Sequence, residues 1–474
     1  MNNATPDNAK KYGLYQDLPR EHGFEPLRID GTIPEELSGT LYRNGPSLFS
    51  SFGERYRQFP DGDGAVSGVR FANGKAWGAV RVVQSKGLVE ERALGKRIYG
   101  TYGTPCVRWI DRVLGKIKNG SNTSVLHWQG RIYALFENGF PTELTTDDLQ
   151  TIGETDLGGV VIQTFTAHPH RHPTRNSIIN FGVRYGPTTK IDLFEIPDQG
   201  SARRLGTIPI SAGLVHDFCL TEKYALFFIP SMRFQLLKQM LGFGVYADNF
   251  KWRPDLGTEI MIVPLDNPSQ FKKLTIDPSF QWHFVNAFEQ GDHIVIDRLP
   301  YPDFDSTNLW FNQVSHGDIH REANGNLMRT TINLKTNKAV SEKLWDRSCE
   351  FPTINDALSG RPYQYGYINA HSDEKAASSV WYDKLVKWDF KTGNIVAEVS
   401  LGEGHYPAEG IFVPAKNPTA EDHGYILALV FDSISNTSYM AVFDAQKMQE
   451  GPLGRAWFDH HIPVTFHGTW VQNN

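Results

Sequence analysis

Four histidines of this chain lie in short, dissimilar settings, and each could supply a metal-binding imidazole. They are His168 in Ala-His-Pro, His216 in Val-His-Asp-Phe, His283 in Trp-His-Phe-Val-Asn-Ala and His467 in Phe-His-Gly-Thr-Trp. Neutral imidazole is a common protein ligand for iron, zinc, copper and nickel. These residues are too far apart in sequence to share a helix face or a zinc knuckle. They can therefore act together only if the fold brings them to one place.

Three glutamates have the apolar neighbours expected of carboxylates buried beside such histidines. Glu137 lies in Leu-Phe-Glu-Asn-Gly, Glu350 in Cys-Glu-Phe-Pro and Glu409 in Ala-Glu-Gly-Ile-Phe. The second ring nitrogen of a metal-bound histidine is usually held by a carboxylate or a carbonyl, which fixes the tautomer and the ring plane. Each glutamate could equally cap a turn or pair with an arginine such as Arg43 or Arg347, because a buried acid needs a partner of some kind.

Motifs of other enzyme classes are missing from the sequence. No GxSxG elbow, HExxH helix or Walker loop is present, which leaves serine hydrolases, zincins and nucleotide hydrolases without an anchor. Asp61-Gly-Asp-Gly64 resembles the start of a calcium loop, but the twelfth position is Ala72 where a bidentate glutamate is required. We interpret His127, His371 and His423 as turn or surface residues without a role.

The composition favours a folded protein made of many short strands. Of the 474 residues, 40% are hydrophobic and 21% charged, and 43 Gly and 27 Pro suit tight turns better than long helices. The net charge of −6 is spread without a basic stripe, so nucleic acid is an unlikely partner. Three scattered cysteines without a CxxC argue against a disulfide framework and fit a reducing compartment. The chain starts without a signal-peptide pattern and has no bilayer-spanning run, so we expect a cytoplasmic protein.

Short β-rich runs separated by turns recur from about residue 30 to the end, for example at 131–136, 176–183, 223–229, 293–298 and 424–431. A strand-turn-strand unit returns at a spacing on the order of 50 to 70 residues, the range of propeller blades that carry insertions. We therefore predict an all-β fold, with an N-terminal extension over 1–25 and a single β-propeller over 26–474. The innermost strands of a propeller share one axis, where distant histidines can meet. Two β-sandwiches with unrelated histidines are the alternative.

Taken in order, these segments resemble the carotenoid cleavage oxygenases, a family of non-haem iron(II) dioxygenases built on a seven-bladed propeller. The likeness covers nearly the whole chain, through Gly39-Thr-Leu-Tyr-Arg-Asn-Gly-Pro46, Phe165-Thr-Ala-His-Pro169, His216-Asp-Phe218, Trp282-His-Phe-Val-Asn286 and Phe466-His-Gly-Thr-Trp470. It implies seven blades, with short helices and loops forming a cap over an iron centre. It also implies that one Fe(II) is bound by His168, His216, His283 and His467. Glu137, Glu350 and Glu409 would accept hydrogen bonds from three of these rings, which leaves His168 without a glutamate.

The resemblance also implies a reaction, in which both atoms of dioxygen are inserted across one conjugated double bond and two carbonyl products form without a reductant. Thr123 lies where relatives place a small residue that crowds an open metal position, and Phe136, Trp282 and Tyr301 could stabilise positive charge on a polyene. Stilbene-cleaving relatives carry lysine at the position of Phe136, so an apolar polyene is favoured as the substrate. The chain is most similar to the bacterial apocarotenoid branch, which predicts cleavage of the central 15,15' bond of an apocarotenal or apocarotenol to give retinal. A stilbene-cleaving dioxygenase, a retinoid isomerase and a non-enzymatic propeller that binds an apolar ligand are the alternatives.

Two segments, 109–118 and 232–252, mix crowded apolar residues with basic ones. They could form a membrane-facing entrance for an apolar substrate, or simply a pair of helices packed over the propeller. The resemblance favours the entrance, because a polyene must be drawn from a bilayer. We therefore expect peripheral membrane association and no obligatory protein partner. The candidate entrance residues are Trp109, Phe234, Leu236, Leu237, Met240, Leu241 and Phe243.

Overall fold

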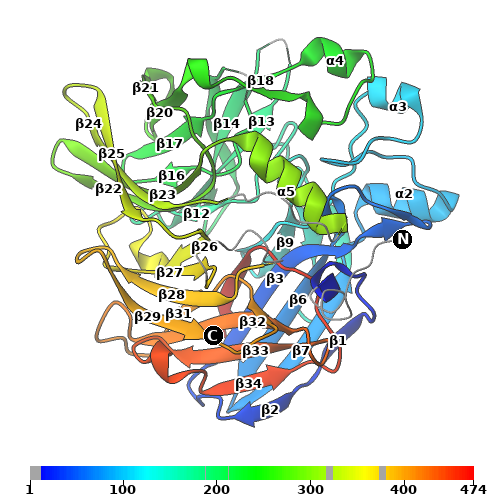
Figure 1. Ribbon diagram of the computed structural model, residues 1–474, viewed down its shortest axis with the longest axis vertical. Coiled ribbons are helices and arrows are strands. Elements are labelled where there is room, and N and C mark those ends of the chain that lie inside the picture. Colours follow the sequence, from blue (N-terminus) through cyan, green and yellow to red (C-terminus); the bar gives the residue numbers. More distant parts are fainter. Residues whose placement is uncertain (1–11, 187, 212, 317–323, 373–380, 474) are drawn as a thin grey trace.

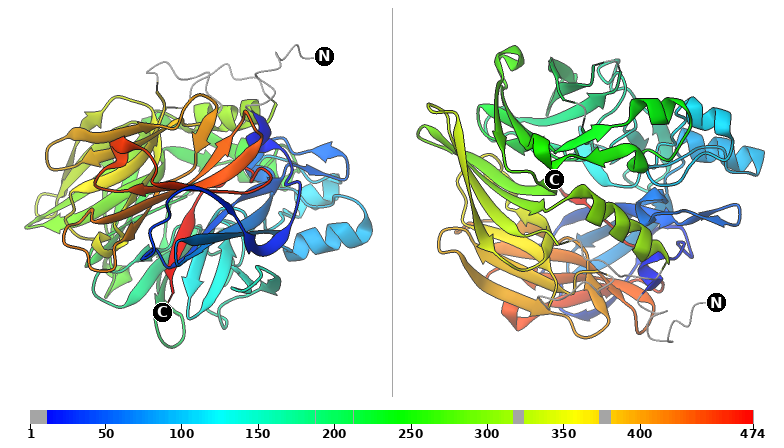
Figure 2. Two further views of the ribbon diagram at one scale, coloured as in Figure 1. Left: turned by 90° about the horizontal axis from the view of Figure 1, so that it is seen from below. Right: turned by 45° about the horizontal axis from the view of Figure 1, so that its top comes forward.

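Seven antiparallel sheets are arranged around a central axis in the computed structural model, as Figures 1 and 2 show. The structure describes residues 12–186, 188–211, 213–316, 324–372 and 381–473. Most of the described elements are strands, and the helices are few and short. The predicted seven-bladed β-propeller is confirmed, and the β-sandwich alternative is wrong.

The blades follow one another along the chain, and each is built largely from consecutive strands. The second blade contains β8 (Ser124–Trp128), β9 (Arg131–Leu135), β10 (Thr142–Leu144) and β11 (Thr151–Glu154). The third contains β12 (His170–Arg171), β13 (Ser177–Arg184), β14 (Lys190–Pro197) and β15 (Arg203–Pro209). The fourth contains β16 (Cys219–Leu220), β17 (Tyr224–Ile229), β20 (Thr258–Pro264) and β21 (Lys272–Ile276). The fifth contains β22 (Phe280–Gln290), β23 (His293–Tyr301), β24 (Leu327–Asn333) and β25 (Lys338–Trp345), and the sixth contains β26 (Cys349–Ile354), β27 (Tyr365–Ala370), β28 (Lys384–Asp389) and β29 (Asn394–Ser400).

The first and seventh blades combine strands from both ends of the chain, which closes the ring. The first contains β1 (His22–Pro26), β7 (Lys75–Val82), β6 (Asp63–Ala72), β3 (Gly39–Leu48) and β35 (Gly468–Gln472). The seventh contains β2 (Arg28–Gly31), β34 (Gly454–Trp457), β33 (Thr437–Asp444), β32 (Gly424–Asp432), β30 (His405–Pro407) and β31 (Ile411–Pro414). Because β35 pairs with β3, the residue after His467 lies opposite Arg43. The pairing that closes the ring therefore determines the position of His467, the last of the four histidines.

The expected boundary between an extension and the propeller at residues 25 and 26 lies inside β1, and the structure corrects it. β1 pairs with β7 through His22 and Val80. Tyr15 of the preceding 3-10 turn (Tyr12–Tyr15) is fully buried against Phe49 and Phe59. The described part of the N-terminal segment therefore belongs to the propeller. The part over residues 1–11 lies outside the described residues.

The hydrophobic core lies between adjacent blades. Side chains of a strand alternate between its two faces, so each blade presents an apolar surface to both neighbours. Phe181 of β13, for example, packs edge-on against Phe227 of β17 in the next blade. Strands in the middle of a blade, such as β14 and β17, are almost wholly buried, which explains their nearly continuous apolar sequences.

Short helices and two hairpins cover one end of the axis and form the expected cap. They are α2 (Lys86–Leu94), α3 (Trp109–Val113), α4 (Leu236–Met240), α5 (Phe304–His316), the hairpin β18 (Met232–Phe234) with β19 (Phe250–Trp252), and the hairpin β4 (Ser50–Ser51) with β5 (Glu54–Arg55). α3 and α4 lie side by side at one edge, whereas α5 crosses the middle of the molecule (Figure 1). α3 ends at Val113, so the helix that the sequence offered as one alternative for 109–118 covers only the first half of that segment.

The helix α5 was not anticipated from the sequence. The side chains of Phe304, Thr307 and Val314 are buried at helical spacing. Two of the buried positions, Ser306 and Thr307, are polar, so the sequence lacks the continuous apolar stripe that would have indicated a helix. The Asp303 carboxylate accepts a hydrogen bond from the Ser306 backbone at 2.7 Å at the start of the helix.

A buried ion cluster holds α2 against the first blade. Nζ of Lys118 donates to Asp63 Oδ2 at 2.8 Å, to Glu91 Oε2 at 2.9 Å and to the Tyr56 hydroxyl at 2.8 Å. All four side chains are almost inaccessible to solvent. Burial alone would lower the pKa of Lys118, but the attraction of Asp63, Tyr56 and Glu91 holds it above the usual lysine value. The Lys118 ammonium therefore offsets the desolvation cost of the two buried carboxylates of Asp63 and Glu91.

Replacing Lys118 by Met should destabilise the protein by about 3–5 kcal/mol, because two buried carboxylates lose their cation. Urea unfolding followed by tryptophan fluorescence measures the loss. Lys86→Met removes an exposed lysine of α2 and should change stability by no more than about 0.5 kcal/mol. Equal stability of the two variants would contradict this account of the cluster.

Candidate metal centre

The four histidines predicted from sequence meet on the propeller axis. His168 precedes β12, His216 precedes β16, His283 lies within β22 and His467 immediately precedes β35. Four different blades thus supply them through inner strands or the turns that lead into those strands. Nε2 of His168 is 2.9 Å from that of His216, and Nε2 of His283 is 3.3 Å from that of His216 and 3.0 Å from that of His467. The structure brings all four together.

The spacing of these nitrogens fits one bound metal ion. Two imidazole nitrogens bound at about 2.1 Å to one ion and at right angles to each other lie about 3.0 Å apart. The three measured separations lie close to this value. The ligand atoms of His168, His216 and His283 also lie within 4.8 Å of one another. Four imidazoles turned toward one point, three of them buried and that of His467 largely so, therefore form a site that could bind a metal.

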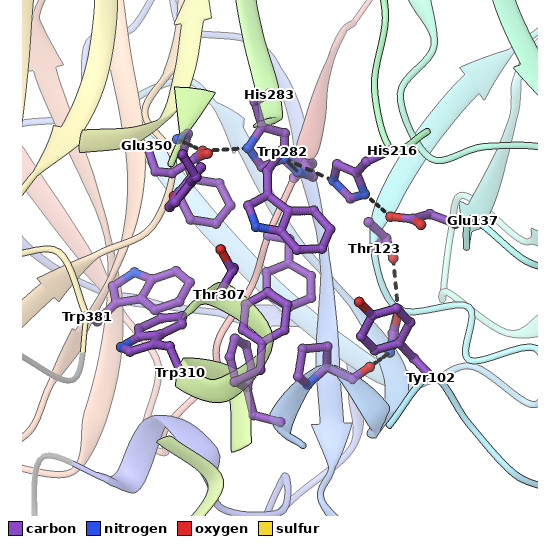
Figure 3. A pocket seen from close by; sticks show the side chains of 18 of the residues that line it. Tyr102, Thr123, Glu137, His216, Trp282, His283, Thr307, Trp310, Glu350 and Trp381 are labelled. Carbon is purple, nitrogen blue, oxygen red and sulfur yellow. Dashed lines mark hydrogen bonds and ion pairs between the residues drawn. The ribbon is translucent and has the colours of Figure 1, made fainter. Parts of the chain in front are cut away.

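Each of three rings has a glutamate at its other nitrogen. Nδ1 of His283 lies 2.5 Å from Glu350 Oε2, and Nδ1 of His467 lies 2.9 Å from Glu409 Oε1. Nδ1 of His216 is paired with Glu137 Oε1. Figure 3 shows the first and third of these contacts on opposite sides of the centre. A carboxylate at Nδ1 fixes the tautomer with Nε2 free to bind a metal.

Glu409 also has the arginine partner that the sequence left open. Nη1 of Arg43 donates to Glu409 Oε2 at 3.2 Å and to its backbone oxygen at 3.0 Å. Arg43 also donates to the Phe466 carbonyl at 2.7 Å, next to His467. Both contacts considered from the sequence are present, because one Glu409 oxygen contacts the histidine and the other the arginine.

Burial keeps most of the rings neutral. It lowers the pKa of His168, His216 and His467 well below the usual histidine value. Burial acts in the same direction on His283, but the charge of Glu350 outweighs it and the pKa of His283 is raised. Burial also raises the pKa of Glu409 to about 7, against the opposing charge of Arg43. Neutral imidazole is the form that binds metal, so three of the rings are ready to act as ligands at neutral pH.

An aromatic cavity opens onto one side of the centre. It contains about 1060 Å³ of empty space including its mouth, and His216, His283 and His467 form part of its wall. The predicted residues Thr123, Phe136, Trp282 and Tyr301 all line it. The backbone oxygen of Thr123 accepts a hydrogen bond from the His467 amide at 3.2 Å, so Thr123 is beside a ligand. Trp282 projects into the cavity, with Tyr102 on one side and Trp310 and Trp381 on the other (Figure 3).

Much of the cavity wall was missed by the sequence analysis. α5 contributes Thr307, Trp310 and Phe311, and later segments contribute the further residues Phe351, His371, Trp381, Tyr382 and Phe466. The interpretation of His371 as a turn or surface residue was wrong. Its ring is 6% exposed, lies on the cavity wall and stacks on Tyr382 with ring centres 4.4 Å apart. A buried histidine flanked by Ala and Ser gives no pattern that sequence reasoning could have detected.

The candidate entrance residues form an exposed apolar patch rather than part of the cavity wall. Side chains of α3, of α4 and of the turn after α4 are about half exposed or more, namely Trp109, Leu236, Leu237, Met240, Leu241 and Phe243. Trp109 Nε1 donates to the Leu241 carbonyl at 3.1 Å and joins the two helices. Phe234 differs, because it packs beneath the patch against Phe250 and Tyr246. Tyr246 in turn contacts Tyr102 of the cavity wall with ring centres 6.0 Å apart, so an aromatic layer connects the patch to the cavity.

Replacing His283 by Ala should weaken Co(II) binding to the metal-free protein by at least about 100-fold. Loss of a residue that hydrogen-bonds to a metal ligand already costs about 10- to 100-fold in affinity, and loss of the ligand itself should cost more. Competition with a coloured chelator measures the affinity. His293→Ala removes a histidine of the same blade that bonds to Asn333 outside the centre, and it should leave the affinity unchanged. Wild-type affinity in His283→Ala would show that the four histidines do not form the site.

Comparisons with known proteins cover nearly the entire chain. The sequence model of the family described as retinal pigment epithelial membrane protein matches residues 15–472. Apocarotenoid-15,15'-oxygenase of Synechocystis sp. is 31% identical over 97% of this chain and 95% of its own length. Lignostilbene-alpha,beta-dioxygenase isozyme III of Sphingomonas paucimobilis is 30% identical over 98% of this chain and 97% of its own length.

The fold leads to the same group of proteins. The crystal structure of cobalt-substituted Synechocystis ACO superposes with a TM-score of 0.89 at 29% identity and covers 98% of this chain and 99% of that chain. The relatives are named as oxygenases and dioxygenases, and the protein is accordingly an enzyme of this class. From the four converging histidines, the propeller around them and these full-length matches, we conclude that the chain belongs to the family of the retinal pigment epithelial membrane protein and the carotenoid cleavage oxygenases.

Proposed function

We propose that the protein is a non-haem Fe(II) dioxygenase that cleaves the central 15,15' double bond of an apocarotenal, or of the corresponding alcohol, to give retinal. The observation that carries the proposal is a four-histidine centre at the wall of an aromatic cavity. The described lining residues include no lysine or arginine, and their carboxylates, Glu137 and Glu350, contact histidines of the centre. Such a wall suits an uncharged conjugated chain.

Iron is the metal that this donor set and chemistry support best. Four neutral imidazoles leave Fe(II) its full positive charge, and Fe(II) when bound supplies the redox chemistry by which dioxygen reacts with a double bond. The glutamates hold the rings, and Thr123 beside His467 limits the space next to the centre. The reaction balances without a reductant, because one double bond is broken and each of its carbons receives one oxygen atom of dioxygen.

Aromatic side chains near the centre support a reaction that develops positive charge on a polyene. The Trp282 ring lies edge-on to His216 with ring centres 4.6 Å apart, and the rings of Phe280 and Phe311 lie 4.8 Å and 5.3 Å away. Phe136 and Tyr301 complete this part of the wall. The negative faces of such rings attract a developing cation and are worth about 0.5–2 kcal/mol each. We assign this role to Trp282, Phe136 and Tyr301.

Polar atoms in the wall support an oxygen-bearing substrate end. Among the described residues, the Tyr102 hydroxyl, the Thr307 hydroxyl and Nε2 of His371 are buried without a hydrogen-bond partner. Buried polar atoms are normally paired, and an aldehyde or hydroxyl of the substrate would satisfy one of them. The same Tyr102 hydroxyl is the observation that favours the second candidate, a stilbene-cleaving dioxygenase, because it could bond a phenol. Phe136 argues against that candidate, since it offers a phenol no hydrogen bond.

The apolar patch supports uptake of the substrate from a membrane surface. No helix among the described residues is long and apolar enough to cross a bilayer. The half-exposed side chains of α3 and α4 could instead enter the headgroup region, and the layer of Phe234 and Tyr246 continues from them to Tyr102. We therefore propose a peripheral membrane enzyme of the cytoplasm whose entrance lies on the Tyr102 side of the cavity.

The iron-loaded protein should convert an apocarotenal to retinal and a second aldehyde, with one dioxygen consumed for each substrate. Mass analysis after reaction under ¹⁸O₂ should find label in both aldehydes, provided that they are reduced at once to prevent exchange with water. Chelated protein should be inactive, and resveratrol should give no aromatic aldehyde. Cleavage of resveratrol instead would favour the stilbene enzyme, and oxygen-independent conversion of a retinyl ester would favour an isomerase. An unchanged ligand would favour a binding protein.

Replacing Trp282 by Leu should lower kcat by roughly tenfold through loss of the ring face, while Trp282→Phe should retain most of the activity. Steady-state oxygen consumption gives kcat, and Co(II) affinity should be equal in both variants. Trp345→Leu is the matched control, because Trp345 stacks on Trp388 away from the cavity. Equal rates for Trp282→Leu and the wild type would refute the assigned role.

Introducing glutamates at Leu237 and Phe243 should weaken binding to phosphatidylcholine vesicles by at least about tenfold, because two apolar side chains no longer enter the bilayer. Sedimentation with the vesicles measures the bound fraction. Glutamates at Ile152 and Val340, which are equally exposed on other blades, should have little effect. The membrane proposal fails if both double variants bind as the wild type does.

A further inference from the structure

His168 differs from the other three histidines in its surroundings. Among the described residues, no glutamate reaches its Nδ1 atom, and no other acceptor lies within hydrogen-bond distance. The nearest acid is Asp217, whose Oδ1 lies 4.0 Å from Nδ1. This carboxylate belongs to the residue that follows His216 and is 3% exposed. It takes no part in the chemistry proposed above.

Asp217 contacts segments that bear three of the four histidines. Oδ1 accepts hydrogen bonds from the Phe218 amide at 2.7 Å and from Nε2 of His170 at 2.9 Å. Oδ2 accepts from the Phe284 amide at 3.1 Å. Phe284 follows His283 in β22, and His170 lies two residues after His168. One side chain therefore joins the third, fourth and fifth blades at the level of the centre.

His168 borders a second cavity, where a nearby charge could restrain its ring. His168 and His170 line this cavity, which contains about 1510 Å³ of empty space including its mouth. Glu409 and His467 also reach this cavity, so it meets the centre from the side opposite the aromatic cavity. The other three rings are held by glutamates. On the side of this cavity, Asp217 is the acid close enough to restrain the His168 ring electrostatically.

We propose that Asp217 is a positioning residue of the metal centre, which orients His168 through its negative charge and fixes the backbone next to His216 and His283. Its effect on His168 is electrostatic at 4.0 Å, because that separation is too long for a hydrogen bond. Its effect on the other two ligands passes through the Phe218 and Phe284 amides. The inference rests on the proposed metal site.

Asp217→Asn tests the proposal, because it keeps the shape of the side chain and removes the charge. Metal-free protein is titrated with Co(II) in competition with a coloured chelator, and the visible absorption of bound Co(II) reports the ligand geometry. We expect roughly 10- to 100-fold weaker binding and a changed cobalt spectrum. Asp192→Asn is the matched control, since Asp192 is a buried acid of β14 paired with Arg184 and Thr207 away from the centre. It should bind Co(II) within about twofold of the wild type, with the same spectrum.

The outcomes separate this inference from the function on which it rests. If the wild type does not bind Co(II), the metal site itself is refuted and the inference fails with it. If the wild type binds and Asp217→Asn has the same affinity and spectrum, only the inference is overturned, and a lower melting temperature in that variant would then mark a purely structural role. Should Asp217→Asn not fold, His170→Leu removes the partner that holds Oδ1 from the cavity side. That variant should weaken Co(II) binding at least about threefold, and unchanged binding overturns the inference.

Discussion

The convergence of four imidazoles on one point is the interaction on which the rest of the structure depends. Nε2 atoms about 3 Å apart in a buried site present their lone pairs to one another, an arrangement that is favourable only around a shared cation. No single blade could supply it, because each blade offers the axis one short inner strand. The propeller brings the four histidines together because its last strand, β35, pairs with β3 and closes the ring. When β35 pairs with β3, His467 is set beside His283 and Glu409 is set between His467 and Arg43.

The centre divides two unlike environments. On one side lies a cavity walled by aromatic rings under α5, and on the other lies a cavity bordered by His168, His170 and the carboxylate of Asp356. The three glutamates and Asp217 hold the rings from the outside, so the rings face inward without help from the substrate. The apolar cavity is then free to select a ligand by shape. This separation of support from recognition is consistent with relatives whose names refer to apocarotenoids and to lignostilbenes.

The sequence predicted the repeating architecture and the ligand types well, because both leave local patterns. Alternating strands followed by turns marked β9, β17 and β32 to within a residue or so, and the apolar neighbours of Glu350 marked it as a buried acid. Pairings across blades leave no such pattern. The sequence alone could not tell that Glu137 of one blade holds His216 two blades away, or that Glu409 would bond both an arginine and a histidine. Most of the cavity wall was also unpredictable, because the buried positions of α5 include polar residues and the residues next to His371 form no recognisable motif.

The central claim is that four imidazoles and no carboxylate bind one iron ion. X-ray absorption at the iron edge of the Fe(II)-loaded protein tests it most directly, because the fine structure reports the number and type of ligands. The account predicts four imidazole nitrogens at about 2.1 Å and no carboxylate bound directly to the ion. A spectrum that requires a glutamate or aspartate oxygen from the protein, or only two imidazoles, would contradict it.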